Sequence, residues 1–173
     1  MDDAFKDRGA TWSPDGKSGI VSAISTRTVW RIDPSRSNDL QSAELLKGAA
    51  DAGLLDVQSW SASGALIAGS FFPDPLSSIP AVWDLTSKTL RKLDLPPASA
   101  GMFAAFLPDS RRLLVSSARG LMLIDLGGGP PRLLRASAPG DTYRLSRDGR
   151  TLVLEHLVFD SDIWLLEIAG AGR

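Results

Sequence analysis

The sequence contains no cysteine and only one histidine among its 173 residues. The absence of cysteine excludes disulfide bonds, thiolate catalysis and cysteine-ligated zinc. The single histidine, His156, excludes any metal site built from several histidines. Disulfide bonds, thiolate catalysis and two common kinds of metal site are therefore ruled out before any motif is considered.

A charge excess and long apolar runs are also missing. The formal net charge is −1, which gives no general reason to expect nucleic acid or an anionic membrane as a partner. No stretch approaches the roughly 18 consecutive apolar residues of a membrane span. The first eight residues are too charged for a signal peptide. We therefore expect no nucleic-acid partner and no membrane insertion, and the residues do not decide between the cytoplasm and a bacterial periplasm.

One short pattern recurs four times. Each copy has a large apolar residue, two spacer positions, an Asp or Ser, and then a Gly or Ser. The copies are Trp12–Gly16, Trp60–Gly64, Phe106–Ser110 and Leu145–Gly149, called the corner turns below. Their last residues lie 48, 46 and 39 positions apart, which is about the length of one four-stranded propeller blade.

Short apolar stretches follow each corner turn at regular places. The first group is predicted to form strands buried on both faces: Ile20–Ile24, Leu66–Ala68, Leu113–Val115 and Leu152–Leu154. The second group ends on an acid: Val29–Asp33, Ala81–Asp84, Met122–Asp125 and Trp164–Glu167. A last, outer strand is predicted in three copies: Glu44–Leu46, Leu90–Leu93 and Arg132–Leu134. A short helix over Ser37–Gly48 is an alternative to the first outer strand, and the prolines of Phe71–Pro80 predict an irregular excursion.

These units predict an all-β, β-propeller-like fold of about four blades of antiparallel strands. The blades cover residues 10–168, at about 10–47, 55–95, 101–136 and 141–168. Residues 1–9 are expected to be a tail or the remnant of a preceding strand, and residues 169–173 a C-terminal tail. Four blades are the lower limit for a closed ring. We therefore expect a partial or assembling propeller, completed by a second copy or by the missing blades of a longer parent chain.

The pattern resembles the WD-like, TolB-type β-propeller repeats of bacterial proteins. The residues that carry this resemblance are Trp12–Gly16, Ser146–Arg150 and Asp162–Leu166. The last blade is similar to the C-terminal blade of propellers fused to bacterial serine/threonine kinases or winged-helix regulators. The second and third copies depart from the turn pattern, at Ala62–Gly64 and Asp109–Ser110. The resemblance implies the fold and says little about function.

Several residues and motifs resemble functional sites. Gly16-Lys17-Ser18 ends like a phosphate-binding loop, but that loop needs a glycine at position 11, where the chain has Thr11, so a turn is predicted. The five tryptophans recur in register and are predicted to fill space between blades rather than form a stacking platform. His156 is interpreted as structural or exposed, and Asp160 and Asp162 as turn formers rather than cation ligands.

The one local charge bias is a group of arginines near the end of the chain. It consists of Arg132, Arg135, Arg144, Arg147 and Arg150. It is either a partner-facing basic patch or a solvated blade edge. We expect no catalytic, cofactor or metal site, and a non-catalytic scaffold that binds a protein or peptide as the sensory part of a larger protein. The alternative is the propeller part of an enzyme, either the gating domain of a prolyl-oligopeptidase-like peptidase or a metal-centred hydrolase.

Overall fold

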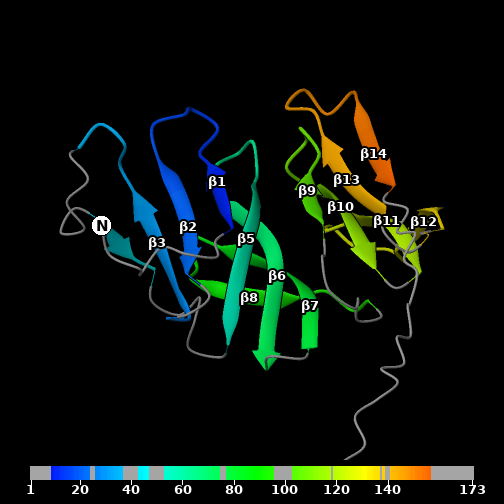
Figure 1. Ribbon diagram of the computed structural model, residues 1–173, viewed down its shortest axis with the longest axis horizontal. Helices are drawn as coiled ribbons and strands as arrows, with labels where there is room; N and C mark the ends of the chain where they lie inside the picture. The colour runs from blue at the N-terminus through cyan, green and yellow to red at the C-terminus, as the bar shows by residue number, and fades with distance from the viewer. Residues whose placement is uncertain are drawn as a thin grey trace, which may run out of the picture.

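The computed structural model describes residues 9–23, 26–36, 43–46, 53–74, 77–95, 103–117, 119–136, 138 and 141–156. Within these ranges the chain forms fourteen strands and no helix. The strands are grouped into separate antiparallel sheets, one for each repeat of the sequence, and the sheets follow one another around a common centre (Figure 1). The predicted all-β, propeller-like fold is confirmed.

Sheets 1 to 3 each have four strands in sequence order. Sheet 1 consists of β1 (Ala10–Trp12), β2 (Gly19–Ala23), β3 (Thr28–Ile32) and β4 (Glu44–Leu45). Sheet 2 consists of β5 (Leu54–Trp60), β6 (Leu66–Asp74), β7 (Ser77–Asp84) and β8 (Thr89–Lys92). Sheet 3 consists of β9 (Ala104–Phe106), β10 (Arg112–Ser117), β11 (Gly120–Asp125) and β12 (Arg132–Arg135). Sheet 4, as described, pairs β13 (Asp141–Leu145) with β14 (Leu152–His156).

Each corner turn joins the innermost strand of a sheet to the second strand. In the first turn, the Ser13 hydroxyl donates to Asp15 Oδ1 at 2.6 Å and accepts from the Ser18 backbone N–H at 2.9 Å. The Asp15 carboxylate also accepts from the Lys17 N–H at 3.0 Å. Gly16 closes the turn with a φ of 71°, a left-handed conformation that favours glycine. Gly16-Lys17-Ser18 is therefore part of a turn, as predicted.

Apolar side chains fill the spaces between successive sheets. One cluster joins sheets 1 and 2 and includes Ile20, Leu55 and Phe71, all fully buried. A second joins sheets 2 and 3 and includes the fully buried Leu113 and Val115. A third packs Tyr143 of sheet 4 against sheet 3. The sheets therefore pack face to face, as the blades of a propeller do.

The structure tests two predictions about strand ends and corrects one of them. The excursion predicted over Phe71–Pro80 is wrong in that β6 continues to Asp74 and β7 begins at Ser77, and the irregularity is limited to a register shift between Phe71 and Asp74. Pro80 fits inside β7 because its backbone faces away from β6: its carbonyl accepts from the Leu93 N–H, just beyond the end of β8, so the missing proline N–H removes no hydrogen bond between β6 and β7. In sheet 1 the strand prediction at Glu44 is confirmed, whereas most of Ser37–Gly48 lies outside the described residues.

The strand after the fourth corner turn also differs from expectation. It was predicted to be buried on both faces, but every residue of β14 is exposed, and Val153 retains 56% of its accessible surface. The physical reason is that β14 pairs with β13 alone within the described part of the chain. The third strand predicted at Trp164–Glu167 lies outside the described residues, as do Asp160 and Asp162.

Candidate binding hollow at the centre of the sheets

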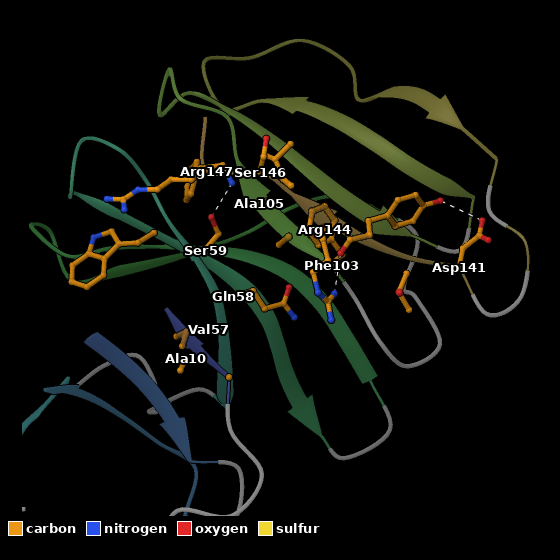
Figure 2. Close-up of a pocket in the computed structure, with 17 residues that line it drawn as sticks. Ala10, Val57, Gln58, Ser59, Phe103, Ala105, Asp141, Arg144, Ser146 and Arg147 are labelled. Carbon is orange, nitrogen blue, oxygen red and sulfur yellow. Dashed lines mark hydrogen bonds between the residues drawn. The ribbon is translucent and has the colours of Figure 1, made fainter. Parts of the chain in front are cut away.

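The innermost strands of the four sheets surround a central hollow of about 630 Å³ (Figure 2). We call it the inner hollow. Its lining comes from β5, β9, β13 and the start of β1, with the residues Gly9, Ala10, Val57–Trp60, Phe103–Phe106 and Asp141–Arg147. Such a central space is where a propeller brings together side chains from all its blades.

A second hollow of about 700 Å³ lies among the corner turns, and we call it the mouth hollow. It is lined by Trp12, Ser13, Pro14, Gly16, Trp60, Ala62, Phe106, Leu107, Pro108 and Arg147. All four repeats contribute, because each corner turn ends its innermost strand at the same end of the central space. Trp60, Phe106 and Arg147 line both hollows, so the two hollows adjoin, and we take the mouth hollow as the entrance to the inner one.

Direct contacts join neighbouring corner turns. The Ser63 backbone N–H donates to the Ser110 hydroxyl at 2.8 Å, which links the second turn to the third. Gly149 of the fourth turn lies directly against the ring of Pro108 in the third. The Arg147 guanidinium donates to the Pro14 carbonyl at 3.1 Å, which links the fourth turn to the first. The rim of the mouth hollow is therefore held by contacts between residues far apart in the sequence.

The tryptophans do not share one environment, although they were predicted to fill space between blades. Trp83 is 2% exposed and lies in the cluster between sheets 1 and 2, as predicted. Trp30 and Trp60 are half-buried, and the Trp60 indole N–H donates to the Gly64 carbonyl at 2.9 Å. For Trp12 the prediction is wrong, because it is 59% exposed and lines the mouth hollow. Trp164 lies outside the described residues.

The five arginines of the predicted basic patch occupy different parts of the structure. Arg132 and Arg135 lie on β12, the outer strand of sheet 3. Arg144 lies on β13 and lines the inner hollow, while Arg147 is in the fourth corner turn and lines both hollows. Arg150 follows that turn and is exposed. The structure thus brings two of the five arginines to the central space, and whether any of them faces a partner stays a prediction.

Asp141 is the most enclosed charged group at the inner hollow, since its side chain is only 1% exposed. Its Oδ2 accepts from the Ala138 backbone N–H at 2.9 Å, and its Oδ1 lies 2.8 Å from His156 Nδ1. Arg135 Nη2 lies 3.7 Å from Asp141 Oδ2. The Ala138 hydrogen bond, with the His156 hydrogen bond and the charge of Arg135, lowers the pKa of Asp141 below its usual value despite burial. His156 itself is 45% exposed at its side chain, in line with a structural or exposed histidine.

The aspartates of the corner turns are also held in their charged form. The Ser13 hydroxyl lowers the pKa of Asp15, and the Ser146 hydroxyl does the same for Asp148. At Asp109 partial burial acts in the opposite direction, but hydrogen bonds from the backbone and side chain of Arg112 lower the pKa to about 2. These carboxylates satisfy the backbone donors of their own turns, so their role is to build the rim.

Sequence reasoning missed two features of this site, the exposure of Trp12 and the pairing of Asp141 with His156. The first had only a signal of place: Trp12, Trp60 and Phe106 share the first position of the corner turn, at the end of the innermost strand, but Trp60 is half-buried and Phe106 is buried there. The second had none, because Asp141 and His156 are fifteen residues apart on two strands whose register the repeat alone does not set.

Two further kinds of feature are absent from the described residues. Within those residues no group of three or more His, Asp or Glu side chains is arranged to hold a metal ion. The described part of the chain also contains no helix with the length and apolar character needed to cross a membrane.

The arrangement of sheets is similar to that of several solved propellers. TolB from Acinetobacter baumannii matches with a TM-score of 0.69 and 19% identity, over 89% of this chain and 38% of that one. An oligogalacturonate lyase in complex with manganese has a TM-score of 0.61 and 14% identity, over 84% and 45%. The β-propeller domain of the Trilobed protease from Pyrococcus furiosus has a TM-score of 0.53 and 15% identity, over 86% and 48%. No family model and no curated protein matches the chain.

These likenesses establish the fold but not the activity, because identities this low do not carry a function across. The three similar structures include an enzyme that acts on oligogalacturonate, a TolB protein and a domain of a protease. The chain spans less than half the length of each of them. Together with the four antiparallel sheets around a central hollow, the likenesses show that this chain has a TolB-like β-propeller fold.

Proposed function

We propose that this chain is a non-catalytic propeller module that binds a peptide segment of another protein at the mouth hollow. The observation that carries the proposal is the exposure of Trp12 in that hollow, beside Trp60 and Phe106. A tryptophan that retains 59% of its accessible surface keeps a large apolar area in contact with water. Aromatic side chains and arginine are the residues most enriched in the parts of interfaces that contribute most to binding.

The chemistry of the lining supports binding rather than catalysis. The ten residues of the mouth hollow include one hydroxyl, that of Ser13, which is buried and donates to Asp15 within its own turn. Their remaining side chains are apolar, apart from the indole N–H groups and the guanidinium of Arg147. A nucleophile activated by an adjacent base, the usual requirement of covalent catalysis, is not present among these ten residues.

The size of the hollows limits what can be bound. A volume of about 700 Å³ is within the usual range for a ligand pocket of roughly 300–1,000 Å³. That space accommodates a few residues of an extended chain, not a folded domain. Because the mouth hollow continues into the inner hollow, an extended segment can enter with its backbone along the central axis. We therefore favour a short linear segment as the partner.

The proposal is tested by selecting peptides from a phage-displayed library of random 12-residue sequences on the immobilised wild-type chain. Selected peptides are resynthesised with a fluorophore, and their dissociation constants are measured by anisotropy. We expect Trp12→Ala to weaken binding at least tenfold, because it removes the largest exposed contact surface. Leu134→Ala, which shortens an exposed apolar side chain on β12 away from both hollows, is the matched control and is expected to change binding less than twofold. The proposal fails if no peptide is enriched, or if both variants bind like the wild type.

A further inference from the structure

We propose that Arg147 recognises a carboxylate of the bound segment, so that the mouth hollow selects acidic peptides. The inference rests on the proposed function and goes further, because it assigns the chemical class of the ligand and the residue that reads it.

The position of Arg147 departs from the repeat. The equivalent third residues of the other corner turns are Pro14, Ala62 and Pro108, and all four line the mouth hollow. A proline or alanine suffices to build this turn, so the turn itself does not require a long cationic side chain. Because the repeat fixes the location, the substitution delivers one guanidinium to the entrance. Arg147 is thus an arginine at a turn position where the other three repeats have a small, uncharged residue.

Among the charged side chains that line the hollows, arginines outnumber carboxylates, whereas the rim carboxylates Asp15, Asp109 and Asp148 line neither hollow and accept hydrogen bonds within their own turns. Arg147 is the one charged residue among the ten that line the mouth hollow. The charged residues that line the inner hollow are Arg144, Arg147 and Asp141. Figure 2 shows the two guanidinium groups at separate points along this space, both distant from the labelled Asp141. Asp141 interacts with His156 and Arg135, so its negative charge is already balanced within the protein.

The present partner of Arg147 is a weaker acceptor than a carboxylate. Its guanidinium donates to the neutral carbonyl of Pro14 at 3.1 Å. The neighbouring Asp148 carboxylate accepts instead from the Ser146 hydroxyl at 2.6 Å and from the Arg150 N–H at 3.1 Å. A guanidinium has five N–H donors and binds carboxylates through two parallel, charge-assisted hydrogen bonds, which are roughly twice as strong as neutral ones. A ligand carboxylate at the rim therefore gives Arg147 a better acceptor than the one it has.

Trp12 provides an apolar contact beside the guanidinium of Arg147. It lines the same hollow from the first corner turn, whose Pro14 carbonyl is the acceptor for Arg147. An apolar or aromatic ligand residue beside the acid can pack on the exposed indole while the carboxylate meets the guanidinium. The expected ligand is thus an extended peptide with a carboxylate next to an apolar residue. The carboxylate comes either from an Asp or Glu side chain or from the free C-terminus of the segment.

The test uses positional-scanning pools of synthetic hexapeptides, each prepared with a free and with an amidated C-terminus. Binding of every pool is measured by competition against a labelled pool of fully random hexapeptides. The proteins compared are wild type, Arg147→Gln, Arg147→Lys and Arg150→Gln, each checked for an unchanged urea midpoint. Arg150→Gln is the matched control, because it removes a nearby exposed arginine that lines neither hollow.

We expect pools with Asp or Glu to bind wild type at least tenfold better than pools with Asn or Gln, since a hydrogen bond to a charged group corresponds to about a tenfold or larger effect. If the free C-terminus supplies the carboxylate, amidation of the peptides is instead expected to weaken their binding to wild type at least tenfold. Arg147→Gln is expected to abolish the preference, Arg147→Lys to retain part of it, and Arg150→Gln to leave it unchanged.

The two failures are distinguishable. Binding of pools to wild type with no preference for a carboxylate, or a preference that survives Arg147→Gln, overturns this inference and leaves the proposed function standing. Failure of every pool to bind overturns both. A single-stranded oligonucleotide of twelve thymidines is included as a competitor. Tighter binding of this oligonucleotide than of the acidic pools would also overturn the inference, because Arg147 would then bind phosphate in preference to a carboxylate.

Discussion

The packing of the corner turns against one another predicts that chemically identical substitutions will have different costs. Gly16 and Gly149 occupy the same position of two turns, with φ values of 71° and 67°. A Cβ at residue 16 would have no heavy atom within 4 Å, whereas a Cβ at residue 149 would lie 2.5 Å from Pro108 Cδ and 2.7 Å from Cγ. Replacing each glycine by alanine therefore separates backbone strain from a steric clash.

The backbone part is common to both substitutions. An alanine in the left-handed region costs roughly 1–2 kcal/mol, partly offset by the smaller entropy of the unfolded chain, so we expect Gly16→Ala to cost about 1 kcal/mol. At residue 149 the new methyl group also has to displace the ring of Pro108. Overpacking of this kind typically costs about 1–3 kcal/mol, which brings the expected loss for Gly149→Ala to about 2–4 kcal/mol.

The measurement is equilibrium unfolding in urea, with the free energy of unfolding compared at unchanged m-value. Pro108→Ala completes a double-mutant cycle, because it removes the ring atoms that the new methyl group would meet. In that background Gly149→Ala should cost about 1 kcal/mol, like Gly16→Ala, with a coupling energy of about 1–3 kcal/mol. Equal losses for Gly16→Ala and Gly149→Ala in the wild-type background would show that the third and fourth corner turns do not pack together, and would refute the proposed structure of the rim.

Two further predictions concern acid sensitivity and the core. The Asp109 pKa of about 2 in the folded state is below its ordinary value of 3.8, so its contribution to stability is complete above pH 4 and is lost as the pH falls toward 2. Its side chain is 35% exposed, and solvent screening reduces the nominal effect of about 2 kcal/mol to about 1 kcal/mol. Urea unfolding at pH 5 and pH 2.5 should show wild type losing roughly two-thirds of that amount more than Asp109→Asn, because pH 2.5 is still above the folded-state pKa, and equal losses would contradict the role of Asp109. Leu113→Ala should lower the free energy of unfolding by about 2–5 kcal/mol, because Leu113 is fully buried between sheets 2 and 3. Leu133→Ala, at a half-exposed site on β12, should lower it by less than about 1 kcal/mol. A similar loss at both sites would contradict this placement of the core.

The sequence predicted the repeat architecture because the corner turns have strict local requirements. A left-handed position needs glycine or a tolerant residue, and the Ser or Asp side chains before it must accept the backbone N–H groups of the turn. These needs recur in each repeat, so Trp12–Gly16 and Leu145–Gly149 could be aligned without any structure. Ser110 shows the tolerance of the position, since it adopts a φ of 57° where the other turns have glycine.

What the sequence did not predict depends on contacts between repeats or on strand pairing. The prolines of Phe71–Pro80 indicated irregular structure, but the cost of a proline depends on whether its missing N–H faces a strand partner, which a single sequence does not reveal. The exposure of Trp12 follows from its place at the entrance of the central space, not from its residue type. Its equivalent in sheet 2, Trp60, is half-buried at the same repeat position.

In a repeat protein the residues that carry function are best sought where one copy departs from a position that the others treat as structural. Pro14, Ala62 and Pro108 are compatible with a plain turn, so Arg147 has no explanation in the backbone it belongs to. The hydrogen bond to the Pro14 carbonyl does not explain the arginine either. Other neighbouring corner turns contact each other through a short serine side chain, Ser110, or through the backbone of Gly149. A long, always-charged side chain at the entrance of a hollow is instead what recognition of an anionic group requires. The comparison between repeats thus provides a criterion for separating the residues that build the propeller from those that use it.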